Sequence, residues 1–340
     1  MATFPTDFTP KLVSCWREGC TMARLRADAL AGLTVAIVAL PLAMALGIAS
    51  GASPDKGLVT AIVAGFLISA LGGSRVQVGG PTGAFVVVIA GVIAQHGYTG
   101  LLLATAIAGV LLVIAGYIRL GQLMKYVPMP VITGFTAGIA VIIATSQIGD
   151  FLGLEVHDVP AEFLGKWEAY LDAIGTISWP SLAVGGGALL LIVLLKRINP
   201  RLPGYLIAIV VASLAVVLLH LPVETVGARF PDMPTTLPMP QVPAFTLPMV
   251  RDVLPAAFTI AFLAGIEALL SAVVADGMTG YKHRPNQELV GQGVASFASA
   301  LFGGLPATGA IARTATNIRA GAQTPLSGMF HALFLLIGLL

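Results

Sequence analysis

Charge is the scarcest property of this 340-residue sequence, in which only 10% of the residues are Asp, Glu, Lys or Arg. Soluble domains contain about 25% charged residues, so this is not the composition of an ordinary soluble protein. The two cysteines, Cys15 and Cys20, are too few for a disulfide framework and do not have metal-ligand spacing. The net charge of +2 is spread along the chain, which gives no basic patch for nucleic acid.

Apolar residues fill the place of the missing charges. The sequence is 57% hydrophobic and its mean hydropathy is +0.93, which predicts an integral membrane protein. A polar stretch at 150–180 predicts a surface hairpin helix with Trp167, Tyr170 and Trp179 as interface anchors. The expected membrane spans are 29–49, 57–73, 99–118, 129–148, 181–195, 205–221 and 255–275.

Basic residues test the orientation of these spans. The first 28 residues resemble an interfacial helix and show no cleavable signal peptide, so we expect them in the cytoplasm. With that choice, the eighteen Lys and Arg residues lie on the cytoplasmic side with four exceptions, as the positive-inside rule requires. The exceptions are Lys56, Lys166, Arg229 and Arg251.

A run of small residues opens a further, shorter segment. Gly79-Gly80-Pro81-Thr82-Gly83-Ala84 precedes the apolar stretch 85–94, and His96 follows soon after. About 15 residues are too few to cross a bilayer core, which needs about 20 helical residues. The segment therefore predicts a half-helix that begins inside the membrane, with its N-terminal amides turned toward an internal cavity. The plainer alternative is a short helix with a capping loop. A cap by the Thr82 hydroxyl is also expected, and it is compatible with ligand contact.

The same pattern occurs a second time. Ser69-Ala70-Leu71-Gly72-Gly73 precedes the first half-helix, and Ser299-Ala300-Leu301-Phe302-Gly303-Gly304 precedes Pro306-Ala307-Thr308-Gly309-Ala310. Counted in chain order, with the half-helix as segment 3, the first copy lies in segments 2 and 3 and the second in segments 9 and 10. The two copies are seven segments apart, and an odd number of crossings inverts the second copy relative to the first. Inverted repeats of this kind place two half-helices face to face near the bilayer midplane. Chance similarity between small residues is the alternative.

Two charged residues fall within this apolar framework. Glu267 lies near the middle of the 255–275 span, where a charge costs about 3 kcal/mol on insertion scales. It should therefore face the protein interior, and Ser271 shares its helix face. Arg313 lies about one turn beyond Ala310, where it can attract an anion. The alternatives are a packed, neutral carboxylic acid at Glu267 and an Arg313 side chain that extends to the inner headgroups.

Five stretches are specific enough to indicate a family. They are DALAGLTVAIVALPLAMALGIASG from Asp28, GGSRVQVGGPTGAFVVV from Gly72, GIEALLSAVVADGMTG from Gly265, NQELVGQG from Asn286 and GAIARTATNIRAGA from Gly309. Over essentially its whole length, the sequence resembles the SulP (sulfate permease) family of anion transporters. Within that family it is especially similar to the bacterial C4-dicarboxylate transporters.

The resemblance implies an all-α polytopic membrane protein with seven-plus-seven inverted repeats, half-helices at segments 3 and 10, and a core domain that moves against a gate domain. It also implies a homodimer in the bacterial cytoplasmic (inner) membrane. We expect residues 1–28 to be a cytoplasmic segment, 29–222 the first repeat, 223–254 a proline-rich extracytoplasmic loop and 255–340 an incomplete second repeat. The sequence is expected to stop within segment 11, without the STAS domain that is usual in the family.

The resemblance also assigns an anion site. The contacts implied at the openings of segments 3 and 10 are Thr82, Gly83, Ala84, Gly309, Ala310 and Ile311. Arg313 adds positive potential, while Glu267 and Ser271 match positions that hold sodium in related bicarbonate transporters. Here Ile311 stands where those relatives have a coordinating threonine, and Glu267 replaces an aspartate. The loss of an oxygen ligand favours a proton over sodium as the coupling ion.

The combined prediction is a secondary active transporter that takes up C4-dicarboxylates such as succinate, fumarate or aspartate, with one proton on Glu267, by alternating access. No cofactor, metal or nucleic-acid partner is expected. An enzyme is not expected either, because the five histidines lack ligand spacing. Two alternatives remain, namely sodium-coupled bicarbonate or sulfate transport and, in another class, an anion channel.

Overall fold

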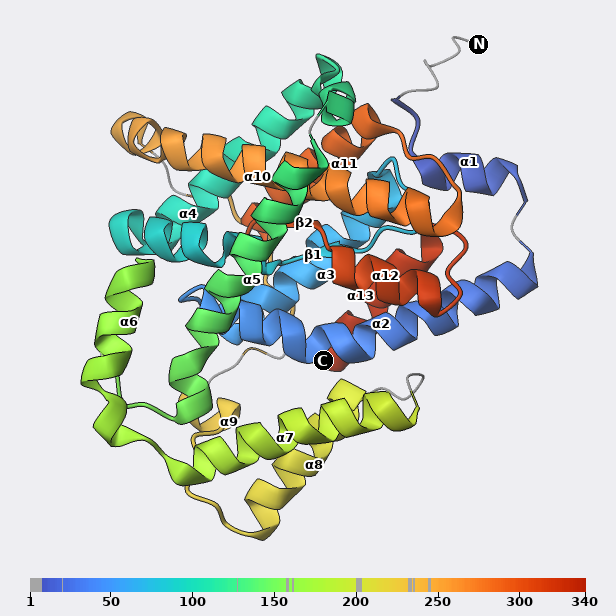
Figure 1. Ribbon diagram of the computed structural model, residues 1–340. Helices are drawn as coiled ribbons and strands as arrows, with labels where there is room; N and C mark the ends of the chain where they lie inside the picture. Colours follow the sequence, from blue (N-terminus) through green and yellow to red (C-terminus); the bar gives the residue numbers. More distant parts are fainter. Residues whose placement is uncertain are drawn as a thin grey trace. The chain divides into compact units, whose positions relative to one another are not determined.

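The computed structural model describes residues 8–19, 21–126, 128–156, 159–160, 162–199, 204–231, 234, 236–243 and 246–340 (Figure 1). Cys20 lies outside the described residues, and Cys15 is buried as a free thiol. The chain divides into two compact units, one made of Met1–Thr136 with Pro234–Leu340 and the other of Ala137–Met233. Each unit is therefore described by itself.

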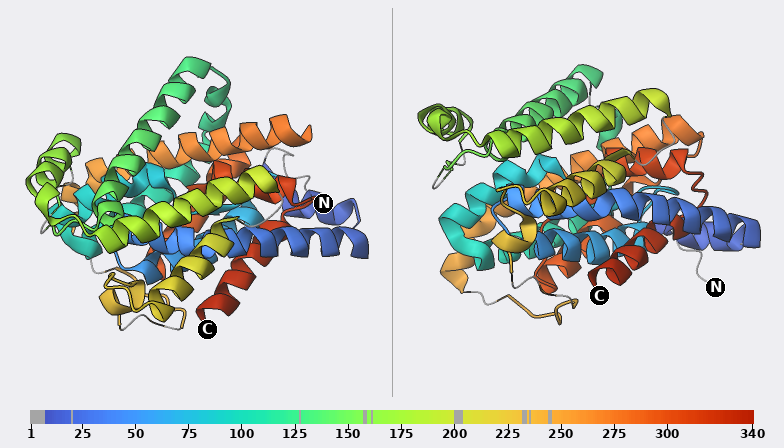
Figure 2. Two further views of the ribbon diagram at one scale, coloured as in Figure 1. Left: turned by 60° about the horizontal axis from the view of Figure 1, so that its bottom comes forward. Right: turned by 90° about the horizontal axis from the view of Figure 1, so that it is seen from below.

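The first unit contains both predicted half-helices. Its helices are α1 (Lys11–Arg17), α2 (Met22–Ala49), α3 (Pro54–Leu71), the 3₁₀ turn η2 (Gly83–Phe85), α4 (Val86–Tyr117), the 3₁₀ helix η3 (Leu120–Tyr126), the start of α5 (Met129–Leu152), α10 (Leu247–Thr279), α11 (Pro285–Leu301), α12 (Ile311–Arg319) and α13 (Leu326–Leu339). Two short strands, β1 (Gly79–Gly80) and β2 (Thr308–Gly309), lie among them (Figure 1). The α13 helix packs along α2 and α3, and Figure 2 shows it beside α2.

The α4 helix is two helices joined at a break. Gly97 has φ +69° and ψ 179°, a left-handed backbone that ends the first helical piece. From Gly83 to this break there are about 14 residues, or about 21 Å of helix, which is shorter than a hydrocarbon core of about 30 Å. The α12 helix has only nine residues. Both predicted half-helices are therefore short helices in the structure.

The core of the first unit lies where α4, α10 and α11 pack together. Phe85, Leu101 and Ile260 have no exposed surface, and they belong to a cluster of buried apolar side chains from these three helices. Phe85 is the last residue of η2 and the start of α4, so its burial anchors the opening of the first half-helix in the core. The core thus fixes the N-terminal end of the first half-helix in place.

Polar side chains exchanged between α3 and α11 hold the turns that precede the two strands. Glu288 of α11 accepts hydrogen bonds from the amides of Gly73 (2.8 Å) and Ser74 (2.9 Å), which follow α3. In return, Thr60 of α3 accepts one at 2.6 Å from the amide of Leu305, which follows α11. Buried amides need such acceptors. Each copy of the predicted repeat therefore supplies the hydrogen-bond acceptor for buried amides in the turn of the other copy.

The second unit contains most of α5 (Met129–Leu152), together with α6 (Phe163–Asp172), α7 (Trp179–Ile198), α8 (Gly204–Leu218) and α9 (Val226–Arg229). The α7 and α8 helices pack against each other. Tyr170 on α6 is buried against Gly149 of α5, so it is not the interface anchor that the sequence predicted. Trp179, in contrast, is 73% exposed and remains free to be one.

The helix boundaries differ from the predictions mainly at α10. This helix begins at Leu247, inside the stretch 223–254 that was predicted to be a loop, and Pro255 lies within it. A proline at Pro248 fits the first turn, because that position needs no amide donor. By length and composition alone, five described helical segments could span a membrane, namely α2, α3, Gly83–Tyr117 taken across its break at Gly97, α7 and α10.

Candidate functional site

The strand pair brings the openings of the two half-helices together. The β1 and β2 strands are antiparallel, with Gly79 opposite Gly309 and Gly80 opposite Thr308 (Figure 1). The Ala310 amide extends the pairing by donating to the Val78 carbonyl at 2.9 Å. Because the strands run in opposite directions, the helices that follow them leave in opposite directions. Their N-termini, which carry free amides and the positive ends of the helix dipoles, meet at the strand pair.

One face of α10 closes this junction. The Thr308 hydroxyl donates to the Ala264 carbonyl at 3.0 Å, and the Gln77 amide donates to the Ala268 carbonyl at 3.2 Å. Residues three, four and seven positions apart lie on one side of a helix, so Ala264, Glu267, Ala268 and Ser271 form a common face toward the strands. The sequence placed Glu267 toward the protein interior, and its contacts agree with that placement.

Glu267 is bound to the first half-helix. The Thr82 hydroxyl donates a hydrogen bond of 2.8 Å to its carboxyl group. Thr82 is the residue at the helix opening, yet its side chain makes no capping hydrogen bond to the helix. The cap expected from the Thr82 hydroxyl is therefore not formed, because the hydroxyl is used by Glu267 instead. This hydrogen bond holds the carboxyl group at the opening of the first half-helix.

Arg313 is enclosed in the junction and only 2% of it is exposed. A side-chain carbon built on Gly80 would lie 2.0 Å from its Nη1 atom, so the guanidinium occupies the space that this glycine leaves. The alternative in which Arg313 extends to lipid headgroups is wrong, since the side chain points into the protein core.

The remaining expected residues are placed unequally. Gly83, Ala84 and Ile311 are half-buried at the openings of the helices, and Ala310 is the buried N-cap of α12. Gly309 instead lies inside the strand pair, where the Gln77 side chain fills the space beside it. This position suits close packing better than contact with a ligand.

Glu267 and Ser271, which were expected to act as a pair, have different hydrogen-bond partners among the described residues. Ser271 is buried, and its hydroxyl lies 3.3 Å from the Thr314 hydroxyl on α12. Glu267 binds the first half-helix and Ser271 the second. The α10 helix therefore connects the two openings.

Three polar residues of the junction were missed at the sequence level. Gln77 and Thr308 donate hydrogen bonds to carbonyls of α10, and the Thr314 hydroxyl accepts one from the Val78 amide. Gln77 stands between Val76 and Val78, and such alternation predicts a strand with one polar face. This signal was present in the sequence, whereas the partner of Thr314 depends on the packing of distant segments.

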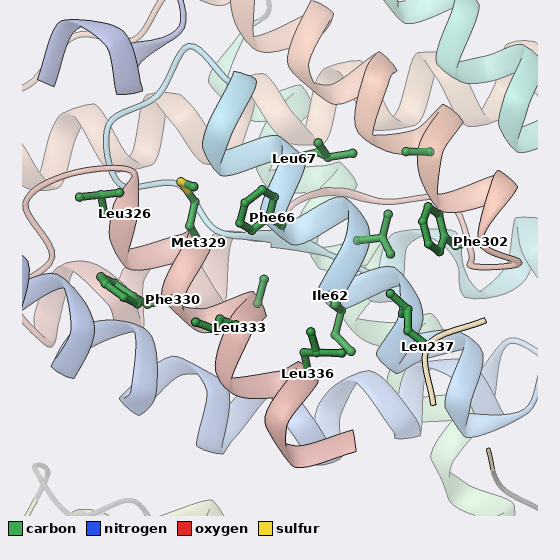
Figure 3. A pocket seen from close by; sticks show the side chains of 13 residues that line it. Ile62, Phe66, Leu67, Leu237, Phe302, Leu326, Met329, Phe330, Leu333 and Leu336 are labelled. Carbon is green, nitrogen blue, oxygen red and sulfur yellow. The ribbon is translucent and has the colours of Figure 1, made fainter. Parts of the chain in front are cut away.

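Other parts of the structure offer less to an anion. Within the described residues, no three His, Cys, Asp or Glu side chains are grouped to hold a metal ion. A groove of about 500 Å³ lies along α3, α11 and α13 (Figure 3). Its walls are apolar side chains such as Phe66, Met329 and Phe330. An anion would lose its hydration there without finding any donor.

The sequence is also similar to those of known proteins. The Sulfate permease family matches residues 25–340. The sequence is 45% identical over 324 residues to the "Putative sulfate transporter YvdB" of Bacillus subtilis (strain 168), covering 95% of this chain and 61% of that protein. It is 32% identical over 326 residues to the "Bicarbonate transporter BicA" of Picosynechococcus sp., covering 93% of this chain and 57% of that protein. The chain thus spans about 60% of the length of these curated relatives.

Solved structures support the same fold. The transmembrane domain of a cyanobacterium bicarbonate transporter BicA matches with a TM-score of 0.81 and 31% identity, over 94% of this chain and 83% of that one. Murine Slc26a9, an anion transporter, matches with a TM-score of 0.87 over 100% of this chain and 60% of that one. At 17% identity this second likeness concerns the fold alone. The predicted all-α inverted-repeat fold with two half-helices is confirmed.

Proposed function

The chain belongs to the sulfate permease family, and we infer that it is the membrane part of a secondary transporter that carries a small inorganic oxyanion. The observation that carries this inference is the junction itself, where two helix N-termini, Thr82 and the buried Arg313 converge. Free amides and helix dipoles at such termini favour negative charge. Broken helices at the membrane midplane are common substrate sites in secondary transporters.

As substrates we propose sulfate or bicarbonate, and not C4-dicarboxylates. The relatives reported above are named as a sulfate transporter and bicarbonate transporters. These names support the inorganic anions, which the sequence had left as the alternative, better than succinate or fumarate. Both anions present oxygen acceptors to the amides of Gly83, Ala84 and Ile311 and to the charge of Arg313.

For the coupling ion we propose a proton on Glu267. Its carboxyl group has one oxygen bound by Thr82, and Ser271 is engaged with Thr314. A hard metal cation prefers several oxygen ligands. Among the described residues, Glu267 and Ser271 have different hydrogen-bond partners, so their oxygens are not seen to share one site. Sodium coupling therefore has less support than proton coupling.

Transport by alternating access requires the site to move as one body. All the proposed site residues lie in the first unit, so this unit is a candidate for the moving core domain, and the second unit for part of the gate domain. We propose a multi-pass location in a bacterial cytoplasmic membrane with a cytoplasmic N-terminus, and a homodimer for the full-length protein. The bias of Lys and Arg residues supports this orientation.

Anion binding to the purified 340-residue chain in lipid nanodiscs tests the proposal. Isothermal titration with sulfate, bicarbonate, succinate and chloride should show saturable binding of sulfate or bicarbonate. Arg313→Gln should weaken that binding by at least tenfold, about 1.4 kcal/mol, whereas the exposed Arg251→Gln should leave it unchanged. Succinate binding more tightly than both inorganic anions, or no saturable binding at all, would contradict the proposal.

Replacing sodium by choline in the same titration separates the coupling ions. Binding through a proton site should not depend on sodium but should change with pH in the wild-type chain and lose this change in Glu267→Gln. An anion channel, the alternative from another class, would instead give currents that do not saturate and do not depend on pH.

A further inference from the structure

The first two helices carry an apolar and basic surface that the anion site does not use. On α2, Met22, Arg26 and Leu30 are spaced four residues apart, so they lie on one face of the helix. All three are exposed, Met22 to 71% and Leu30 to 66%. On α1, which a short connection joins to the start of α2 (Figure 1), Trp16 is 70% exposed and Arg17 beside it is exposed as well. We call these five residues the corner surface.

The acidic side chains next to the corner surface are used within the protein. Glu18 pairs with Arg75. Asp28 is fully buried and accepts hydrogen bonds from the backbone that precedes α13. Arg17 and Arg26, in contrast, form no ion pair with any residue that the structure describes. Their positive charge is therefore available to a partner outside the chain.

The length of α2 indicates how deep the corner surface lies in a membrane. Its 28 residues make a helix of about 42 Å, which exceeds a hydrocarbon core of about 30 Å by about two turns. The span predicted from the sequence begins at residue 29, so this excess lies at the N-terminal end of the helix. Met22 and Arg26 therefore reach the layer of lipid headgroups.

The residue types suit that layer. Tryptophan is enriched there, because its ring is apolar while its N–H group is polar. An arginine side chain crosses apolar surroundings with its carbon stem and places its guanidinium among the headgroups. The guanidinium then donates paired hydrogen bonds to phosphate oxygens. Trp16 with Arg17, and Met22 with Arg26, each combine an apolar side chain with such a donor.

We propose that the corner surface is a binding site for anionic phospholipids. Arg17 and Arg26 bind the headgroup phosphates, while Trp16, Met22 and Leu30 lie among the glycerol groups and the first carbons of the acyl chains. The unpaired positive charge favours an anionic headgroup over a zwitterionic one, which carries a cation of its own. Free phosphate or nucleic acid would leave the apolar side chains in water, so a lipid is the better match.

A lipid bound there also steadies the approach to the first half-helix. The Lys11 amide of α1 donates to the Gly72 carbonyl at 3.0 Å, at the end of α3. The Arg284 amide donates to the Gly73 carbonyl at 2.9 Å, and its guanidinium binds the Thr9 carbonyl ahead of α1. The segment anchored by lipid is thus bonded to the turn that leads into β1. Anionic lipid should therefore raise the melting temperature of the protein.

Tryptophan fluorescence can identify the lipids at this surface. The sequence has three tryptophans, so the double substitution Trp167→Phe/Trp179→Phe leaves Trp16 as the single probe. This 340-residue parent is placed in nanodiscs of phosphatidylcholine with a minor fraction of phosphatidylglycerol. Bromine atoms, which quench tryptophan on contact, are carried either by the acyl chains of the phosphatidylglycerol or by those of an equal amount of phosphatidylcholine. The lipid composition is the same in both, so the ratio of the two quenchings measures the preference for anionic lipid.

Brominated phosphatidylglycerol should quench Trp16 at least about twofold more than brominated phosphatidylcholine does. Arg17→Gln/Arg26→Gln should remove most of this preference, together with the rise in melting temperature on adding phosphatidylglycerol. Arg17→Lys/Arg26→Lys keeps both charges and should keep the preference. Arg197→Gln, at an exposed position in the second unit, is the matched control and should leave it unchanged. Added salt should weaken it, because the attraction is electrostatic.

Equal quenching by the two lipids in the parent would overturn the proposal, and so would a preference that the glutamine variant retains. Quenching by neither lipid would place Trp16 outside the bilayer and overturn it as well. None of these measurements uses a transported anion. The proposed function can therefore fail without changing the outcome of this test.

Discussion

At the scale of single residues, the position of the Arg313 guanidinium depends on the absence of a side chain at Gly80. Gly80 has φ +153°, a backbone that L-residues rarely adopt, and its side-chain position is filled by Nη1 of Arg313. The cation lies next to β1 because nothing larger than hydrogen stands there. Position 80 therefore requires glycine, because the buried cation of Arg313 needs the space that a side chain there would fill.

Gly80→Ala tests this dependence. The added methyl group would lie 2.0 Å from Nη1, so the guanidinium must move and the backbone becomes strained. We expect the anion Kd to rise at least tenfold and the melting temperature to fall. Gly91→Ala is the matched control, because Gly91 lies inside α4 with nothing within 4 Å of a new methyl group. That change should raise helix stability by about 0.5–1 kcal/mol and leave the Kd unchanged. Equal effects of both substitutions would contradict the role of Gly80.

At the scale of elements, the half-helices depend on hydrogen bonds exchanged between the two repeats. Glu288 binds the turn after α3, and Thr60 binds the turn after α11. Each turn leads into a strand and then into a half-helix, so each opening is held by a side chain from the opposite repeat. Damage to one repeat should therefore loosen the turn of the other.

Glu288 allows this to be measured. Glu288→Leu leaves the buried amides of Gly73 and Ser74 without an acceptor, which should cost about 2–4 kcal/mol of unfolding free energy. Glu288→Gln keeps an acceptor oxygen and should cost about 1 kcal/mol or less. Thermal unfolding in nanodiscs gives the comparison. A leucine variant as stable as the glutamine variant would show that the turn does not need this side chain.

The helices of this protein could be predicted from the sequence more fully than the contacts between them. The two short helices followed from prolines and small residues at positions 79–84 and 306–310, since these features act locally. The start of α10 was misplaced because the prolines of the stretch 223–254 were taken to exclude a long helix, although a helix in a packed membrane protein tolerates proline. The enclosure of Arg313 and the bond between Thr82 and Glu267 join distant parts of the chain, and neither periodicity nor composition contains that information.

At the scale of the whole molecule, the N-terminal segment is attached to the first unit at several points. The Arg284 guanidinium donates to the Thr9 carbonyl at 2.6 Å and to the Ser14 hydroxyl at 2.9 Å. Arg75 pairs with Glu18, donates to the Gln323 carbonyl at 3.2 Å, and stacks over the Tyr281 ring at 4.5 Å. Segments from both ends of the sequence thus meet at one arginine. The predicted interfacial helix is therefore a packed part of this unit.

The ion pair between Glu18 and Arg75 makes this attachment depend on pH. The hydrogen bond from Arg75 holds the pKa of the Glu18 carboxyl below its usual value. A lowered pKa in the folded state means that the stabilisation is present above the ordinary glutamate pKa and is lost as the pH falls through the folded-state value. The Glu18 side chain is 47% exposed, so solvent screening limits the pair to about 0.2–1 kcal/mol.

Glu18→Gln should therefore lower the melting temperature by about 1–2 °C at pH 7, and the difference from wild type should disappear once the pH is low enough to protonate Glu18. Glu168→Gln, an exposed position on α6 for which the described residues show no ion pair, is the matched control and should give no difference at either pH. Added salt should shrink the effect at pH 7, because an exposed pair is screened. A difference that persists unchanged in acid would mean that Glu18 contributes through packing, and that Arg75 is held by Gln323 and Tyr281 alone.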